Sequence, residues 1–137
     1  MYLFDTMIIS YLLRGDPLAA LYRAELDSNG PMSISCQTVG EILYGAAQKR
    51  WGASKRAKVD RLMLRFTVLP IDMATAAIYG EIRAGADKLG RPLESQDAWI
   101  MATAKQRGLT LVTHDGDMQV GAQVGVDITS RIPDISR

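Results

Sequence analysis

The sequence predicts an α/β protein, a three-layer sandwich around a mostly parallel central sheet of four to five strands. Short apolar stretches alternate with longer segments whose apolar residues recur at helical spacing. Glycine or proline stands at most of the boundaries between them. The chain has 137 residues, 47 % of them hydrophobic, which is enough for a real core. We therefore expect one domain that spans residues 1–137.

The strands are expected where a short apolar stretch lies between breaks. Asn29-Gly30-Pro31 precedes the second stretch, Pro70 follows the third, and Gly108 precedes the fourth. The predicted strands are residues 2–4, 32–34, 65–69 and 109–113, with a fifth over 124–128. Strands that are separated by helices pair in parallel, so their carboxyl ends face the same edge of the sheet.

The helices are expected between these strands. Asp16 and Pro17 are typical of an N-cap and a first helical position, and Ser95 is a candidate cap for the last helix. Gly15 and Gly108 end two of the helices. The predicted helices are residues 6–13, 17–27, 36–50, 54–64, 72–89 and 95–107.

Composition excludes several classes of protein. A net charge of +1 argues against a general polyanion binder. The one cysteine, Cys36, cannot close an internal disulfide, which fits a reducing cytoplasm. Asp5 and Arg14 flank a short apolar run, so no signal peptide is expected, and no apolar stretch is long enough to cross a bilayer. A single histidine, His114, excludes paired-histidine nucleases and zinc sites with several histidines, and we assign it no chemical role.

Five acidic residues stand at predicted helix starts and strand ends. They are Asp5, Glu41, Asp97, Asp115 and Asp117. Asp5 follows the first strand and Asp115 follows the fourth, so a parallel sheet brings both to one edge. Carboxylates that converge repel one another unless a cation neutralises them. The pattern predicts a divalent metal site and metal-assisted chemistry.

Each acid also has a purely structural interpretation. Asp5 can cap the helix that follows it, and Thr38 with Glu41 fits a capping box. Asp97 suits the positive end of a helix dipole, and residues 115–117 match an Asp-Gly turn. Taken singly, the structural interpretation is favoured for each residue. Taken together, one fold places all of them at one edge.

Several stretches, in order, resemble the VapC-type toxins of the PIN-domain family. The opening, residues 1–15, has an apolar strand, then Asp-Thr, then a helix. The other matching stretches are residues 33–35, 39–46, 90–92, 96–104 and 111–117. Each stretch is weak evidence alone, but their order and spacing hold over nearly the whole chain. The resemblance implies a PIN-like fold.

The same resemblance implies a metal-dependent endoribonuclease that is the toxin of a type II toxin–antitoxin system. Matched by position, it implies catalytic roles for Asp5, Glu41, Asp97 and Asp115. Asp5, Asp97 and Asp115 would hold Mg²⁺ or Mn²⁺. Thr6 and Asp117 would be auxiliary residues.

The resemblance also implies partners, namely a VapB-like antitoxin, a structured RNA such as tRNA, and a second copy of the chain. Ile9, Leu12 and Leu43 could serve a homodimer interface, although core packing explains them equally well. Two alternatives stay open. One is a housekeeping PIN nuclease that processes rRNA. The other is a catalytically weakened PIN protein that only binds RNA or a partner, because Met7 stands where the family usually has asparagine.

A basic stretch offers a candidate contact surface. Its residues are Lys49, Arg50, Lys55, Arg56, Lys58, Arg61 and Arg65, with Trp51 nearby and Asp60 as the one acid. Such a stretch can bind RNA phosphates beside a stacking aromatic, contact an acidic partner, or face solvent. The candidate contacts are Lys49, Arg50, Lys55, Arg56 and Arg61.

Overall fold

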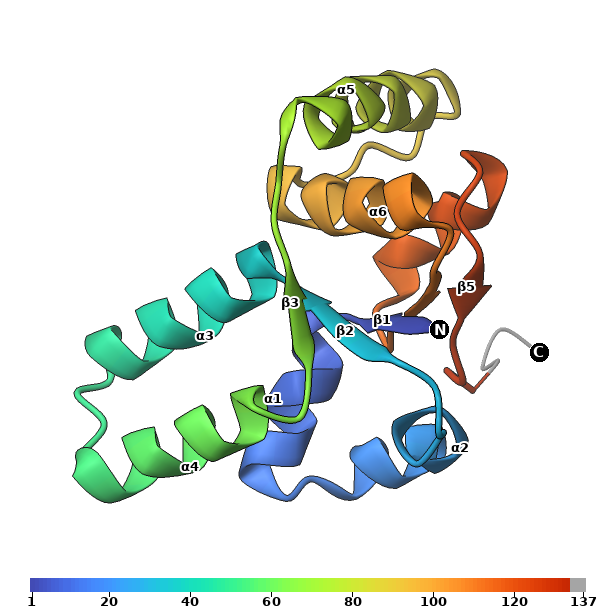
Figure 1. Cartoon of the computed structure of the whole chain (residues 1–137). Helices are drawn as coiled ribbons and strands as arrows, with labels where there is room; N and C mark the ends of the chain where they lie inside the picture. Colours follow the sequence, from blue (N-terminus) through green and yellow to red (C-terminus); the bar gives the residue numbers. More distant parts are fainter. Residues whose placement is uncertain (134–137) are drawn as a thin grey trace.

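The computed structural model describes residues 1–133, and its strands form a five-stranded sheet (Figure 1). The strands are β1 (Tyr2–Phe4), β2 (Met32–Ser35), β3 (Thr67–Leu69), β4 (Thr110–Val112) and β5 (Ile128–Thr129). Their order across the sheet is β3-β2-β1-β4-β5, and every pairing is parallel. The predicted α/β class and parallel sheet are confirmed, although β3 and β4 are shorter than predicted.

Helices cover both faces of this sheet. They are α1 (Thr6–Arg14), η1 (Pro17–Tyr22), α2 (Arg23–Leu26), α3 (Cys36–Gln48), α4 (Ala53–Met63), α5 (Met73–Lys88), α6 (Ser95–Arg107) and η2 (Gly116–Gln123), where η marks 3-10 geometry. Figure 1 shows α5 and α6 on one face and α1 and α2 on the other, with α3 and α4 projecting to one side. No helix within residues 1–133 is both long and apolar enough to span a membrane.

The core is divided in two by the sheet, because successive strand residues point to opposite faces. On β1, Leu3 belongs to the cluster around α5 and α6, whereas its neighbour Phe4 belongs to the cluster around α1 and α3. On β4, Leu111 and Val112 divide in the same way. All four side chains are fully buried. Strands buried on both faces explain why the sequence shows short continuous apolar stretches rather than alternation.

The helix predicted over residues 17–27 is instead a 3-10 helix followed by the short α2. The geometry changes at Tyr22, whose φ is −110° and ψ is 20°. Tyr22 is fully buried, and its hydroxyl donates to the carbonyl oxygen of Thr113 at 3.2 Å. Leu18 and Leu21 stay exposed. One anchored aromatic therefore fixes this segment, and no apolar stripe supports a longer α-helix.

Two boundaries differ from prediction for local reasons. The fifth strand is Ile128–Thr129 rather than 124–128, because Gly125 has a φ of +90° that interrupts extended backbone. Ser95 is the first residue of α6 and not its cap. The N-cap position belongs to Glu94, whose side chain makes no capping hydrogen bond. The prediction of Ser95 as a cap was therefore wrong by one residue.

Strand β1 lies in the middle of the sheet, between β2 and β4. The chain winds from β1 in opposite directions to form the two halves of the sheet. In parallel α/β sheets, a crevice forms at such a point beyond the carboxyl ends of the strands. A hydrogen bond connects the carboxyl ends of β1 and β4 there. The backbone N–H of Asp5 donates to the carbonyl oxygen of Val112 at 2.9 Å.

Candidate functional site

A hollow of about 290 Å³, which we name the acidic hollow, lies where residues following β1 and β4 meet. Its lining residues are Asp5, Thr6, Met7, Ser10, Tyr11, Arg14, Glu41, Asp97 and Asp115. Four of the five acids singled out in the sequence are thus brought together. The fifth, Asp117, is not among the lining residues. It is exposed in η2, and its backbone N–H donates to Oδ1 of Asp115 at 2.9 Å.

Asp5 is the most buried acid of the hollow, with 4 % of its surface exposed. It does cap α1, as its structural interpretation predicted, because Oδ1 accepts from the N–H of Thr6 at 2.8 Å. Its other oxygen, Oδ2, accepts from the hydroxyl of Thr113 at 2.7 Å. Burial raises the pKa of Asp5 in spite of these hydrogen bonds, and the charge of Asp115 adds to the rise. Asp5 therefore caps α1 and lines the acidic hollow at the same time.

Glu41 reaches the hollow from the second turn of α3. Its Oε1 accepts from the hydroxyl of Thr6 at 3.1 Å, and that hydroxyl also lies 3.0 Å from the hydroxyl of Thr38. The predicted capping box of Thr38 and Glu41 was wrong, because Ser35 caps α3 by accepting from the N–H of Gln37 at 3.1 Å. Burial, with a contribution from the charge of Asp5, raises the pKa of Glu41.

Asp97 lies in the first turn of α6, where the helix dipole favours a negative charge. Burial nevertheless raises its pKa to about 7, and repulsion from Asp5 and Asp115 adds to the effect. Within residues 1–133, no basic side chain forms an ion pair with Asp97. A positive charge from outside the chain would therefore stabilise the ionised form of Asp97 near neutral pH.

Asp115 follows β4 and caps η2, so the predicted turn at residues 115–117 is the start of a 3-10 helix. Its backbone N–H donates to the hydroxyl oxygen of Thr113 at 3.1 Å. Because the same hydroxyl donates to Asp5, Thr113 links the two acids that follow β1 and β4. Thr113 is fully buried and was not identified from the sequence. Its position two residues before Asp115, at the end of a predicted strand, was the available signal.

The donor atoms of the hollow suit a hard divalent cation. Its four acids offer only carboxylate oxygens, which Mg²⁺ and Mn²⁺ prefer. Within residues 1–133, no three Asp, Glu, His or Cys side chains are already placed around a common point for a metal ion. Ligation of one ion by three of these acids therefore requires side-chain rotation. Met7 lines the hollow as well, and its thioether is a poor ligand for such ions.

Arg14 is the one cation that lines the acidic hollow. Its guanidinium pairs with Asp16 at 3.2 Å and lies over the ring of Tyr11, 5.3 Å from the centroid. Sequence reasoning missed Arg14, Ser10 and Tyr11 as site residues. Helical spacing was the available signal, since residues at 6, 10 and 14 share one face of α1.

His114 lies beside the hollow without lining it. Its Nδ1 is 2.5 Å from the hydroxyl of Tyr22, and its ring packs edge-on against Tyr11 and Tyr22. The backbone N–H of Arg131 also donates to the Tyr22 hydroxyl, at 2.9 Å. These contacts hold the His114 ring against Tyr11 and Tyr22.

The basic stretch is divided by the structure. Lys49 and Lys55 line a second hollow beside the acidic one, together with Trp51. Arg61 lines two further hollows along α4. Arg50 and Arg56 line none of these hollows. Arg50 occupies the turn between α3 and α4 with a φ of +52°, and Arg56 pairs with Asp60 at 3.4 Å on α4.

Two of the residues suggested for a homodimer interface are only partly buried, and one is fully buried. Ile9 has no exposed surface and belongs to the core, so it cannot contact a second copy. Leu12 and Leu43 are partly exposed and pack against the same core cluster.

Comparison with known proteins gives a consistent result. A family model described as PIN domain matches residues 2–122. The tRNA(fMet)-specific endonuclease VapC of Shigella flexneri is 32 % identical over 114 residues, 83 % of this chain and 86 % of that protein. Toxin FitB of Neisseria gonorrhoeae is 36 % identical over 134 residues, 92 % of this chain and 96 % of that protein. Among solved structures, DNA-bound VapBC from Salmonella typhimurium has a TM-score of 0.77 at 26 % identity, covering 94 % of this chain and 96 % of that chain.

Proposed function

This chain belongs to the PIN-domain family, with VapC-type ribonucleases as relatives, and from that membership we propose how it acts. It is an endoribonuclease of the toxin class, and the acidic hollow is its active site. The reaction is hydrolysis of an RNA phosphodiester that depends on Mg²⁺ or Mn²⁺. The observation that supports this proposal is the gathering of Asp5, Glu41, Asp97 and Asp115 around one hollow.

Asp5, Asp97 and Asp115 would hold the cation, and Glu41 would stand beside it. The pKa values of Asp5, Glu41 and Asp97 are raised in the metal-free protein. Raised pKa values are expected for clustered carboxylates whose charge a bound cation would neutralise. When bound, a divalent ion lowers the pKa of water and stabilises negative charge on phosphate oxygens.

The residues of the chain orient the reaction. Thr113 and the N–H of Thr6 fix both oxygens of Asp5. Glu41 has one side-chain hydrogen bond, from Thr6, and takes the proton that water loses as it attacks phosphorus. The phosphorus–oxygen bond to the departing ribose then breaks, that oxygen takes a proton from solvent water, and Glu41 releases its own proton to solvent. Asp117 supports Asp115 from outside the hollow through its backbone N–H.

The substrate and the partner follow from the names of the relatives. The Shigella flexneri relative is named for cleavage of tRNA(fMet), and the Salmonella typhimurium structure is a VapBC complex. We therefore assign a tRNA as the substrate and a VapB-like antitoxin as the inhibitor. Growth arrest on expression, relieved by co-expression of the adjacent small gene, is the expected phenotype.

The test is cleavage of a tRNA pool by the purified protein with Mg²⁺, Mn²⁺ or EDTA, followed by sequencing of the new RNA ends. Cleavage is expected with either metal and none with EDTA. A double variant, Asp5→Ala with Asp97→Ala, should retain its circular dichroism spectrum and lose cleavage. Cleavage by that variant at the wild-type rate would show that the acidic hollow is not the active site.

A further inference from the structure

The acidic hollow continues into a chain of basic hollows between α1 and α4. A second hollow, also of about 290 Å³, shares Thr6, Ser10, Arg14 and Glu41 with the acidic one. A third, of about 620 Å³, shares Arg14 and Lys55 with the second. A fourth, of about 370 Å³, shares Lys58 and Arg61 with the third. The shared lining residues show that these hollows adjoin one another in a row that starts at the acids, and we treat the row as one groove.

We name this feature the basic groove and define it by its cations. They are Arg14, Lys49, Lys55, Lys58, Arg61 and Arg65. Three of them, Lys55, Lys58 and Arg61, recur every third residue of α4 and follow one inclined ridge of the helix. The groove thus has an ordered row of charges rather than a diffuse basic surface.

These charges are largely unneutralised. Within residues 1–133, Arg14 pairs with Asp16, and no carboxylate lies within ion-pair distance of Lys49, Lys55 or Lys58. The acid of α4, Asp60, pairs with Arg56, which lies off the groove. The whole chain carries a net charge of only +1. The positive potential is therefore local, and a polyanion is directed to the groove rather than to the whole surface.

One cation of the groove, Lys55, is held by an aromatic ring in the hollow that adjoins the acids. The ammonium of Lys55 lies 4.1 Å from the centroid of the Trp51 ring, a cation–π contact that restrains it. Lys55 stands in the first turn of α4, whose N-cap, Gly52, provides no side-chain hydrogen bond. The positive end of the helix dipole therefore adds to the charge of Lys55 at this point.

We propose that the basic groove holds the phosphates of single-stranded RNA on one side of the bond being cut. This inference rests on the function proposed above. An RNA bound for cleavage must present phosphates beyond the scissile one, and the carboxylates of the acidic hollow repel them. Binding energy must come from a neighbouring positive surface that is continuous with the active site. The basic groove meets both conditions, and Arg14 lies at the junction because it lines three of the hollows.

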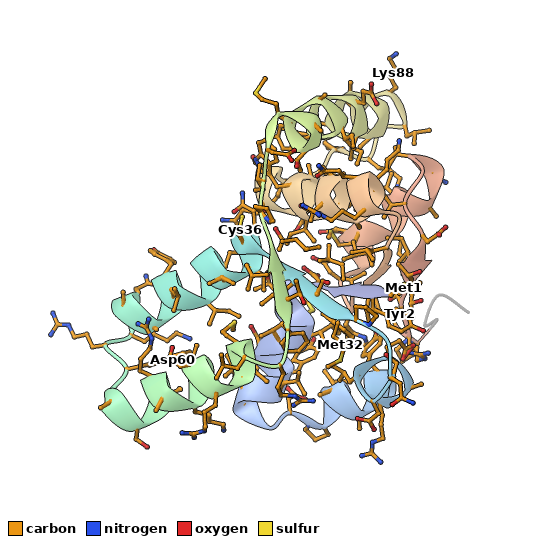
Figure 2. The ribbon with its side chains drawn as sticks, in the orientation of Figure 1. Met1, Tyr2, Met32, Cys36, Asp60 and Lys88 are labelled. Carbon is orange, nitrogen blue, oxygen red and sulfur yellow. The ribbon has the colours of Figure 1, made fainter. Side chains whose placement is uncertain are left out.

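The experiment measures binding of a labelled 16-nucleotide oligouridylate in EDTA by fluorescence anisotropy, across a range of KCl concentrations. The test variant is Lys58→Gln with Arg61→Gln. The control variant is Arg56→Gln with Lys88→Gln, which removes the same charge. Arg56 is on α4 but off the groove, and Lys88 lies at the opposite end of the molecule on α5 (Figure 2).

The test variant should reduce the slope of log affinity against log salt by about 1.4, at about 0.7 for each lost single-strand phosphate contact. Its affinity near 0.15 M salt should fall about tenfold. With a tRNA substrate and Mg²⁺, the KM of this variant should rise while kcat is retained. The control variant should match the wild type in each measurement.

Equal slopes for both variants would overturn the inference, since the effect would then be one of total charge. It would also be overturned if the test variant bound RNA normally but lost affinity for a polyglutamate peptide, because the groove would then serve an acidic protein partner. Failure of the proposed function gives another result. The wild-type protein then cuts no tRNA with Mg²⁺, but the test variant still has a smaller salt slope for RNA binding than the control variant.

Discussion

The hydroxyl of Thr113 donates a 2.7 Å hydrogen bond to Oδ2 of Asp5, across a separation of 108 residues. Both residues are buried, and the same hydroxyl accepts from the N–H of Asp115. One side chain therefore sets the positions of two acids that come from different strands. In the proposed reaction Thr113 would be a positioning residue, because its hydroxyl contacts the carboxylate of Asp5.

Replacing Thr113 with valine should lower ribonuclease activity about 10- to 100-fold, the usual effect of removing the partner of a metal-binding carboxylate. Valine keeps the shape but leaves Oδ2 of Asp5 without its buried donor. The measurement is kcat/KM on tRNA, with the Mg²⁺ concentration for half-maximal rate as a second readout. Thr113→Ser should restore both. If valine and serine behave alike, the hydroxyl has no positioning role.

The stability of the metal-free protein should fall as pH rises from about 4 to 8. Because its pKa is about 7, Asp97 keeps a proton in the folded protein up to about pH 7, whereas the unfolded chain releases it near the ordinary aspartate pKa of 3.8. The stabilising contribution is therefore complete below pH 3.8 and is lost as pH rises through about 7. After allowance for solvent screening, the change is roughly 1–2 kcal/mol.

Asp97→Asn is the matched control for this pH dependence, because the amide is neutral at every pH. In EDTA, the variant should be more stable than the wild type at pH 8 and should show a flatter curve between pH 5 and 8. Urea denaturation at each pH, in EDTA, provides the measurement. A wild-type protein whose stability rises over this range would contradict the raised pKa of Asp97.

Mg²⁺ or Mn²⁺ should raise the melting temperature of the wild-type protein. At a metal concentration about tenfold above the dissociation constant, the shift should be on the order of 5 °C. It should disappear in the Asp97→Asn variant, which removes a ligand charge, and persist in Asp117→Asn, which alters an exposed residue outside the hollow. An equal shift in all three proteins would indicate that the ion binds elsewhere.

Met7→Asn should raise activity. Met7 lines the acidic hollow, and an amide there can donate a hydrogen bond to a carboxylate or a phosphate, which the thioether cannot. One such bond is worth about 1 kcal/mol, or roughly fivefold in kcat/KM. The comparison is initial cleavage rate at saturating Mg²⁺, with Met7→Leu as the control for size. Equal rates for asparagine and leucine would show that position 7 does not limit the reaction.

The sequence predicted the parallel sheet and the four acids of the hollow because both depend on local signals. Apolar stretches, breakers and acids at strand ends are visible within a few residues of one another. Thr113 and the Thr6–Glu41 contact were not predictable, since each joins residues that lie 35 or 108 positions apart. The predicted capping box of Thr38 and Glu41 is a related error. The two residues have the spacing of the motif, but α3 begins three residues earlier and Ser35 is its N-cap.

The basic stretch shows a second limit. Composition grouped Arg50 and Arg56 with Lys49, Lys55 and Arg61, although only the last three line the groove. A basic residue of α4 lines the groove only if it lies on the face of the helix that is turned toward α1. That orientation depends on the packing of Val59, the buried residue of α4, and not on any charge.

The central place of β1 in the sheet also bears on protein synthesis. Strand β1 obtains one of its two neighbours only when β4, which follows it by most of the described residues, has been made. Until then Asp5 lacks the hydroxyl of Thr113, and Asp97 and Asp115 are absent from its surroundings. A nascent chain that stops before β4 therefore cannot assemble the acidic hollow, and its four carboxylates come together only once residue 115 has been synthesised.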